Sequence, residues 1–145
     1  QTNNGLAGAK IQTMDNFDNF TTLSNGQTMT ESFIDSGSNG LFFPDSGIPN
    51  CPDAAFFFCP SSLLSLSAIN QGQNSAVNTV SFGIDNADNL FNNNPTADAF
   101  STLGGTNDSG SFDWGLPFFY GRSVFTSIRG QTTPSGTPPA PWWAY

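Results

Sequence analysis

The chain has 145 residues, with 11 acidic and three basic side chains, so its formal net charge at pH 7 is −8. This charge argues against nucleic acid and anionic membrane surfaces as partners, because both bind proteins through basic patches. The sequence has no histidine and only two cysteines, which excludes Ser-His-Asp and Cys-His catalysis and leaves zinc without its usual ligands. We expect no metal and no cofactor, and any catalysis has to depend on carboxylates.

The composition predicts a single all-β domain. Of the residues, 37% are hydrophobic and 15 are phenylalanines, interspersed with Asn, Ser, Thr and Gly as is typical of extracellular β-proteins. No stretch approaches the ~20 apolar residues that a transmembrane helix needs. This composition favours a secreted, extracellular protein. Because the chain starts at Gln1 rather than at Met, we expect a processed product or a piece of a longer precursor.

The first predicted strands lead to an aspartate. Residues 7–17 alternate in hydrophobicity and are compatible with a strand. The segment 20–35 predicts two strands joined at Asn25-Gly26, a dipeptide that favours a two-residue hairpin turn. The second strand therefore runs directly into Asp35, and a tight turn and the apolar stretch GLFFP follow it.

The two cysteines, Cys51 and Cys59, enclose the short loop CPDAAFFFC. With no histidine and no further cysteine, a local disulfide in an oxidising compartment is a better interpretation than a metal site. The three phenylalanines of this loop would form either a substrate-facing rim or a small satellite core, and the second is favoured.

The middle of the chain predicts one definite strand. Residues 61–70 fit a short helix or a strand, and residues 75–84 predict a strand. Residues 85–95 and 101–110 are rich in turn-forming residues and predict loops. The acidic, amide-rich first loop would be a calcium site or a plain solvated loop; it lacks the spacing of an EF-hand, which favours the plain loop.

The last part of the chain predicts a short helical turn, a strand and a tail. Pro117 is suited to open the helical turn, and residues 123–128 predict a strand. Residues 131–145 are rich in proline and end in aromatic residues, which indicates an extended segment. We expect a β domain over residues 1–130 and an extended C-terminal tail over residues 131–145.

The tripeptide Asp-Ser-Gly occurs three times, beginning at Asp35, Asp45 and Asp108. These residue types are common in polar turns, so the tripeptide alone does not mark a functional site. Only Asp35 has an apolar strand before it and an apolar stretch after it. We therefore predict that Asp35 belongs to a cleft and that the other two aspartates lie at exposed turns.

The run FIDSGSNGLFFPDS at 33–46 resembles the motif of the pepsin-like aspartic proteases, in which two apolar residues precede Asp, Thr or Ser, Gly and Ser. The family's second mark is an apolar-apolar-Gly element followed by a short helix and a strand. WGLPFFYGRSVFTSI resembles that element, with Trp114 and Gly115 as its supporting residues. Nearly the whole chain is also similar to the C-terminal half of a family of bacterial secreted proteins of uncharacterised function. The resemblance implies a single pepsin-like lobe with one or two short helices.

The resemblance implies that Asp35 is the catalytic acid or base, oriented by Ser36, Gly37 and Ser38. Gly37 would let the chain turn close to the carboxylate, while Ser38 would donate to its outer oxygen and Ser36 would bond across to a partner turn. In the resembling enzymes, two such carboxylates share one proton and activate a water molecule that attacks the peptide carbonyl.

The chain departs from a complete enzyme because only one aspartate fits the motif. The second carboxylate would come from an upstream lobe or from a second copy about a two-fold axis, as in retroviral-type proteases. Asp113, the only acid in the second motif, either lies near the site or is a strand-end acid that pairs with Arg122 or caps a turn.

Three functions remain open. The first is a secreted aspartic-endopeptidase-like lobe that acts only with a second lobe or copy. The second is an extracellular structural or self-assembling subunit, because a lone lobe exposes sheet edges and apolar area. The third is a peptide-binding module without catalysis. Each implies a protein or peptide partner, and we expect an oligomer or a fragment of a larger precursor rather than a stable monomer.

Overall fold

The computed structural model describes residues 5, 6, 8–108 and 110–145. Over this range the chain is mostly strand and irregular structure with one short α-helix, so the expected all-β class is confirmed. Ala7 of the first predicted strand, Ser109 of the third Asp-Ser-Gly copy and the start at Gln1 lie outside the described residues. The elements are β1 (Ile11–Thr13), β2 (Phe20–Ser24), β3 (Gln27–Ile34), β4 (Leu41–Phe42), β5 (Leu64–Gln71), β6 (Val77–Ile84), α1 (Ala87–Asn93), β7 (Gly104–Gly105), β8 (Asp113–Trp114), the 3-10 helix η2 (Leu116–Phe119), β9 (Phe125–Thr126) and β10 (Trp142–Ala144).

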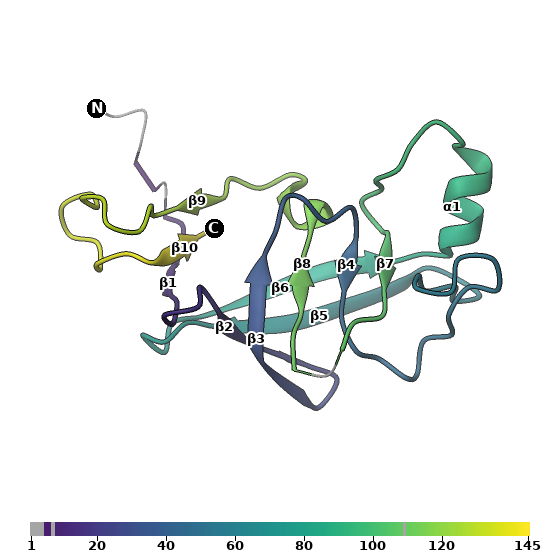
Figure 1. Cartoon of the computed structure of the whole chain (residues 1–145), viewed down its shortest axis with the longest axis horizontal. Helices are drawn as coiled ribbons and strands as arrows, with labels where there is room; N and C mark the ends of the chain where they lie inside the picture. The colour runs from purple at the N-terminus through teal and green to yellow at the C-terminus, as the bar shows by residue number, and fades with distance from the viewer. Residues whose placement is uncertain (1–4, 7, 109) are drawn as a thin grey trace.

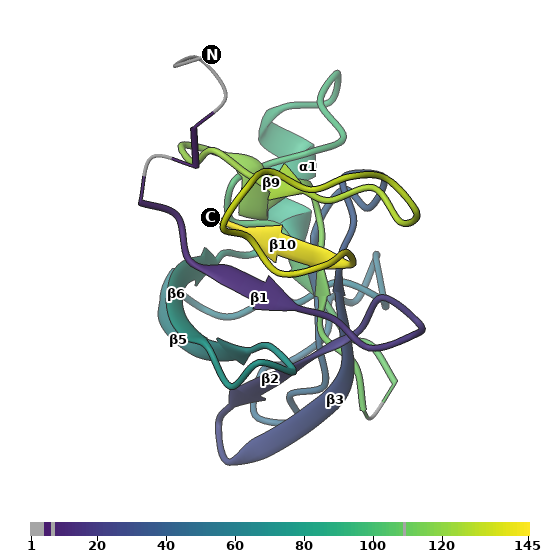
Figure 2. The same ribbon diagram turned by 90° about the vertical axis from the view of Figure 1, so that its left-hand side faces the viewer.

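The strands form two sheets. The larger sheet has seven strands in the order β6-β5-β2-β3-β8-β4-β7, and the smaller has the order β1-β10-β9. Figure 1 shows β3, β8, β4 and β7 side by side, with α1 at one end of the molecule and the small sheet at the other. In Figure 2 the small sheet faces the viewer beside the β5–β6 hairpin.

The β2–β3 hairpin has the turn that its sequence predicts. Ser24 pairs with Gln27, and the two residues between them, Asn25 and Gly26, have φ angles of 47° and 74°. Asparagine and glycine tolerate this left-handed region better than other residues. The hairpin therefore fixes where β3 begins. The buried residues of β3 are Met29, Ser32 and Ile34, and the pairing with β2 shifts register between Met29 and Ser32.

Strand β8 is inserted between two strands that are close together in sequence. It runs parallel to β3, with Phe33 opposite Asp113, and antiparallel to β4, with Phe42 opposite Asp113. β3 and β4 are therefore not paired with each other, although only residues 35–40 separate them. That short connection has to turn beside the end of β8, which brings it close to the second motif.

The core beneath these strands is aromatic. The ring centroids of Phe112 and Trp114 are 3.9 Å apart with nearly parallel planes, and Phe43 stacks on Phe112 at 4.7 Å. Both Phe112 and Trp114 are fully buried. Since successive residues of a strand point to opposite faces, this packing places the side chain of Asp113 on the other face of the sheet.

A buried polar chain links the two sheets. Tyr145, which follows β10, receives a hydrogen bond from Asn70 Nδ2 on β5 and donates one to Gln12 Oε1 on β1, both at 2.9 Å. Asn70 Oδ1 accepts from the hydroxyl of Thr22, which in turn accepts from the indole N–H of Trp114. The small sheet is therefore connected through side chains to the strand that carries Asp113.

Several predicted elements need correction or refinement. Residues 85–95, predicted as a loop, contain α1, whose N-cap Asn86 accepts the backbone N–H of Asn89 at 2.9 Å. Residues 101–110 contain the short strand β7, and residues 61–70 lie mainly in strand β5. The terminal segment is more structured than an extended tail, because β10 pairs with both β1 and β9.

Candidate active site

Asp35 lies where β3 ends and the connection to β4 begins. Its backbone N–H donates to the carbonyl of Trp114 at 3.1 Å, and its side-chain Oδ1 accepts the backbone N–H of Gly37 at 2.7 Å. The side chain is half-buried, whereas Ser36 and Gly37 are exposed. The carboxylate is therefore held at a fixed place at the rim of the sheet.

The second Asp-Ser-Gly copy makes the same local turn. Asp45 Oδ1 accepts the backbone N–H of Gly47 at 2.9 Å, and its Oδ2 accepts from Asn25 at 3.2 Å. Asp45 is half-buried, so it is less exposed than predicted, while Asp108 is exposed as predicted. The tripeptide thus accounts for the turn, and only the tertiary surroundings distinguish Asp35 from Asp45.

Ser38 brings a second acid to Asp35. Its hydroxyl oxygen lies 3.1 Å from Asp35 Oδ2 and 2.6 Å from Asp113 Oδ2. We call Asp35, Ser38 and Asp113 the acid site. A second carboxylate therefore lies beside Asp35 within this chain, and Asp113 is near the site rather than a remote strand-end acid.

Asp113 is the more deeply buried of the two acids. Its side chain is 7% exposed, and its Oδ1 is buried without a hydrogen-bond partner among the described residues. Burial raises the pKa of Asp113 to about 6; the hydrogen bond with Ser38 opposes this rise and the charge of Asp35 adds to it. Because a raised pKa in a carboxyl group often marks a functional site, this acid is a candidate for proton transfer.

Gly115 allows the acid site to close. A Cβ atom built on Gly115 would lie 2.0 Å from the carbonyl oxygen of Gly40 and 2.7 Å from that of Ser38. The next residue, Leu116, donates its backbone N–H to the same Ser38 carbonyl at 2.7 Å. The second motif thus supports the turn after β3 through direct backbone contact, and only glycine fits there.

The other predicted contacts differ in outcome. Arg122 does not pair with Asp113: its guanidinium lies 4.3 Å from the centre of the Phe118 ring and donates to the Phe118 carbonyl. The bond from Ser36 to a partner turn stays a prediction. Sequence reasoning placed Asp113 in the site only as one of several alternatives; the signal was an acid between two aromatic residues, Phe112 and Trp114, in an apolar segment.

Comparison with family models gives one assignment. A family model described as Protein of unknown function (DUF3443) matches residues 1–145, the full length of the sequence. The chain belongs to the DUF3443 family. Neither the curated proteins nor the solved structures gave a match. The geometry of the acid site is accordingly the main ground for assigning a function to this DUF3443 chain.

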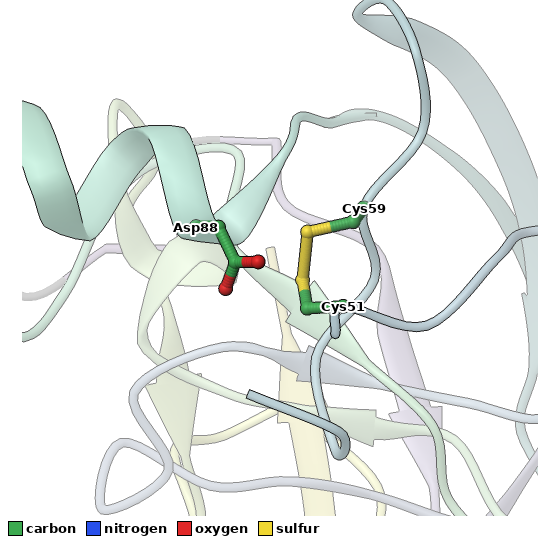
Figure 3. A group of neighbouring side chains, drawn as sticks. All are labelled: Cys51, Cys59 and Asp88. Carbon is green, nitrogen blue, oxygen red and sulfur yellow. A yellow bond between two sulfur atoms is a disulfide. The ribbon is translucent and has the colours of Figure 1, made fainter. Parts of the chain in front are cut away.

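The DUF3443 chain also has a cluster around its disulfide. Figure 3 shows the carboxylate of Asp88, on α1, directed toward the bond between Cys51 and Cys59. The disulfide confirms the predicted pairing. Sulfur atoms in a disulfide are not thiolates and do not ligate metals, so this group is not a metal centre in this state. The loop is joined to α1 by the backbone hydrogen bond from Ala87 N–H to the carbonyl of Phe58 at 3.1 Å.

The phenylalanines of the cysteine loop are divided between several environments. Phe58 is completely buried in the main core, while Phe57 packs on the small cluster around Cys51 and Leu103. Phe56 is 76% exposed.

Within the described residues, no helix has the length and apolar character needed to cross a membrane.

Proposed function

We propose that this DUF3443 chain is an aspartic-endopeptidase-like lobe in which Asp35 is the catalytic acid or base. The observation that carries the proposal is the pair of carboxylates on one serine hydroxyl, with Asp35 fixed by the N–H of Gly37. Acid pairs that share a proton are how carboxylates hydrolyse amides without a metal or a histidine. A peptide bond is the substrate class that this chemistry fits.

The order of the elements supports the resemblance to a pepsin-like lobe. The strand β8, the Gly115 position, the 3-10 helix η2 and the strand β9 follow one another in the order expected of the second motif. Pro117 stands in the first turn of η2, and Trp114 and Gly115 lie against the turn that carries the first motif. The two motifs are thus brought together as an enzyme of this type requires.

The exposure of the turn supports a role for a second lobe or a second copy. Ser36 and Gly37 are exposed and Asp35 is half-buried, so water and substrate can reach the carboxylate from one side. Hydrolysis of a peptide requires that the substrate be held and that bulk water be excluded. A second lobe or copy placed over this turn would hold the substrate and exclude bulk water.

The disulfide is compatible with a secreted enzyme.

The proposal is tested by acid proteolysis. The full chain is incubated with an unfolded protein substrate between pH 3 and pH 7, and new amino termini are counted. We expect cleavage with an acidic optimum, and we expect Asp35→Asn to lower its rate by at least ~100-fold, because general acid or base catalysis contributes 10²–10⁴-fold.

Asp45→Asn is the matched control, because Asp45 begins the same tripeptide and makes the same turn hydrogen bond but lies outside the acid site. It should retain full activity. Binding of the substrate without cleavage at any pH would instead favour a peptide-binding module.

A self-assembling subunit is the second candidate function. The large apolar side chains of Phe17, Phe56 and Ile128 are 83%, 76% and 67% exposed. The strand β6 forms an edge of the large sheet, whereas the outer side of β7 pairs with residues 56–58 of the cysteine loop. Exposed apolar groups and unpaired strand edges both favour association with another chain, and the same surfaces would serve a lobe that needs a partner.

A further inference from the structure

We infer that Asp113 is the proton partner of Asp35, joined to it through the Ser38 hydroxyl, so that one lobe contains an acid pair sharing a single proton. The inference deepens the proposed function, and only its catalytic consequence rests on that proposal. It also differs from the expectation that the second carboxylate has to come from another lobe or copy.

The number of protons supports the inference. The Ser38 hydroxyl has one proton, yet its oxygen lies within 3.1 Å of an Asp35 oxygen and 2.6 Å of an Asp113 oxygen. If both acids were ionised, the hydroxyl would donate to one of them and present a lone pair to the other. One added proton removes this conflict, because the protonated acid then donates to Ser38 and Ser38 donates to the ionised acid.

The surroundings place the added proton on Asp113. Asp113 is 7% exposed and its Oδ1 has no partner among the described residues, which penalises an ionised carboxylate more than a neutral acid. Asp35 is half-buried, and its Oδ1 accepts the N–H of Gly37, which stabilises its ionised form. The short contact of 2.6 Å is then a hydrogen bond from Asp113 to Ser38.

The arrangement permits a balanced proton shift. Asp113 gives its proton to the Ser38 oxygen while Ser38 gives its own proton to Asp35 Oδ2. The serine is a hydroxyl before and after, Asp113 becomes ionised, Asp35 becomes protonated, and the pair keeps one negative charge throughout. Asp35 can in this way receive a proton without contact with bulk water.

Few other charges act on this pair. Strand β3 contributes Glu31, which is exposed, whereas β4 and η2 carry no ionisable side chain. The nearest cation along the chain, Arg122, is engaged with Phe118. The titration of Asp113 should therefore depend mainly on its burial and on Asp35.

The inference is tested by carbon NMR of the aspartate carboxyl groups of the full chain between pH 2.5 and pH 8. We expect Asp113 to titrate near pH 6 and its carboxyl resonance to show a second inflection that reports its coupling to Asp35, because coupled acids titrate as a pair. In Asp35→Asn, the second inflection should disappear and the Asp113 midpoint should fall, while staying above that of an exposed aspartate because burial remains. Asp45→Asn should leave both features unchanged.

A single inflection for Asp113 that is identical in the wild type and in Asp35→Asn would overturn the inference, as would a wild-type midpoint near 4. A kinetic measurement adds a second readout: Asp113→Asn and Ser38→Ala should each lower kcat by about 10²-fold with KM unchanged. Asp113→Asn should also lose the alkaline limb of the pH profile, where Asp113 gives up its proton. Coupled titration without any proteolysis would retain the pair and reject the proposed function. Proteolysis that needs Asp35 but not Asp113 or Ser38 would retain the function and reject the pair.

Discussion

Asp113 is held in the folded chain with a pKa of about 6, against 3.8 for an ordinary aspartate. The folded state therefore binds this proton more tightly than the unfolded state does. The contribution of Asp113 to stability is fully present below about pH 4 and is lost as the pH rises through 6. At neutral pH the ionised, buried carboxylate would cost about 3 kcal/mol, at about 1.4 kcal/mol for each unit of pKa.

This loss of stability with rising pH gives a prediction for Asp113→Asn. The amide has nearly the same shape but does not titrate, so the variant should lose the fall in unfolding free energy between pH 4 and pH 7 that we expect of the wild type. The measurement is urea unfolding at several pH values, with Asp45→Asn as the reference for a half-buried aspartate outside the acid site. Parallel pH profiles for the wild type and Asp113→Asn would contradict the burial argument.

The two tripeptides show what a residue pattern determines and what it leaves open. Asp35 and Asp45 both accept the N–H of the glycine two residues later, because that contact depends only on the local sequence. The approach of Asp113 to Ser38 depends on a strand that arrives from 75 residues away. The turn chemistry could therefore be predicted from the sequence, whereas the acid pair could not.

At the scale of the elements, the connection between β3 and β4 depends on one close backbone approach. Gly115→Ala should destabilise the chain by roughly 3 kcal/mol, because its methyl group would overlap two carbonyl oxygens, those of Gly40 and Ser38. These are backbone atoms, so the turn and β8 would have to separate. The separation would also lengthen the contact between Ser38 and Asp113.

Gly130→Ala is the matched control for that variant. Gly130 has a φ of 77° and open space around its Cβ position, so alanine there should cost about 1 kcal/mol from backbone strain alone. Thermal or chemical unfolding compares the two variants. If Gly115→Ala were no more costly than Gly130→Ala, the close approach of the second motif to the turn would not be a constraint on the fold.

The elements that were predicted correctly depend on local backbone preferences, whereas the missed helix depends on tertiary contacts. The Asn25-Gly26 hairpin and the proline-initiated η2 follow from local backbone preferences, and both were predicted. Helix α1 was missed because its sequence, ADNLFNN, has weak helix propensity. It is stabilised instead by the Asn86 cap and by the packing of Ala87 on the cysteine-loop cluster. Such tertiary stabilisation is not visible in a local pattern.

At the scale of the whole molecule, the outer face of the large sheet is a candidate surface for association. Leu23 on β2 and Ile69 on β5 are cross-strand neighbours, and they are 37% and 42% exposed. Val77, paired with Gln71 of β5, is 48% exposed on the edge strand β6. This apolar surface is continuous with an open sheet edge, as an interface between chains requires.

We therefore expect the chain to be larger than a monomer at micromolar concentration. Light scattering should give a mass above 15.4 kDa, and Ile69→Asp should lower it if the outer face of the sheet is the interface. The comparison is Ile128→Asp, which places the same charge at an exposed residue shortly after β9 of the small sheet. A monomeric mass with a cooperative unfolding transition would show that the lobe is stable alone.

The insertion of β8 between β3 and β4 also determines when the acid pair can exist. Asp35 precedes Asp113 in the chain, and Asp113 belongs to a strand that can dock only after the chain has closed the loop of 75 residues between Ser38 and Asp113. Loop closure of this kind is a slow, entropically opposed step of folding. A nascent or partly folded chain has the Asp35 turn without the buried acid beside it. The proposed acid chemistry would thus be confined to molecules that have completed their fold. An incompletely folded chain would not cleave proteins while it is being made.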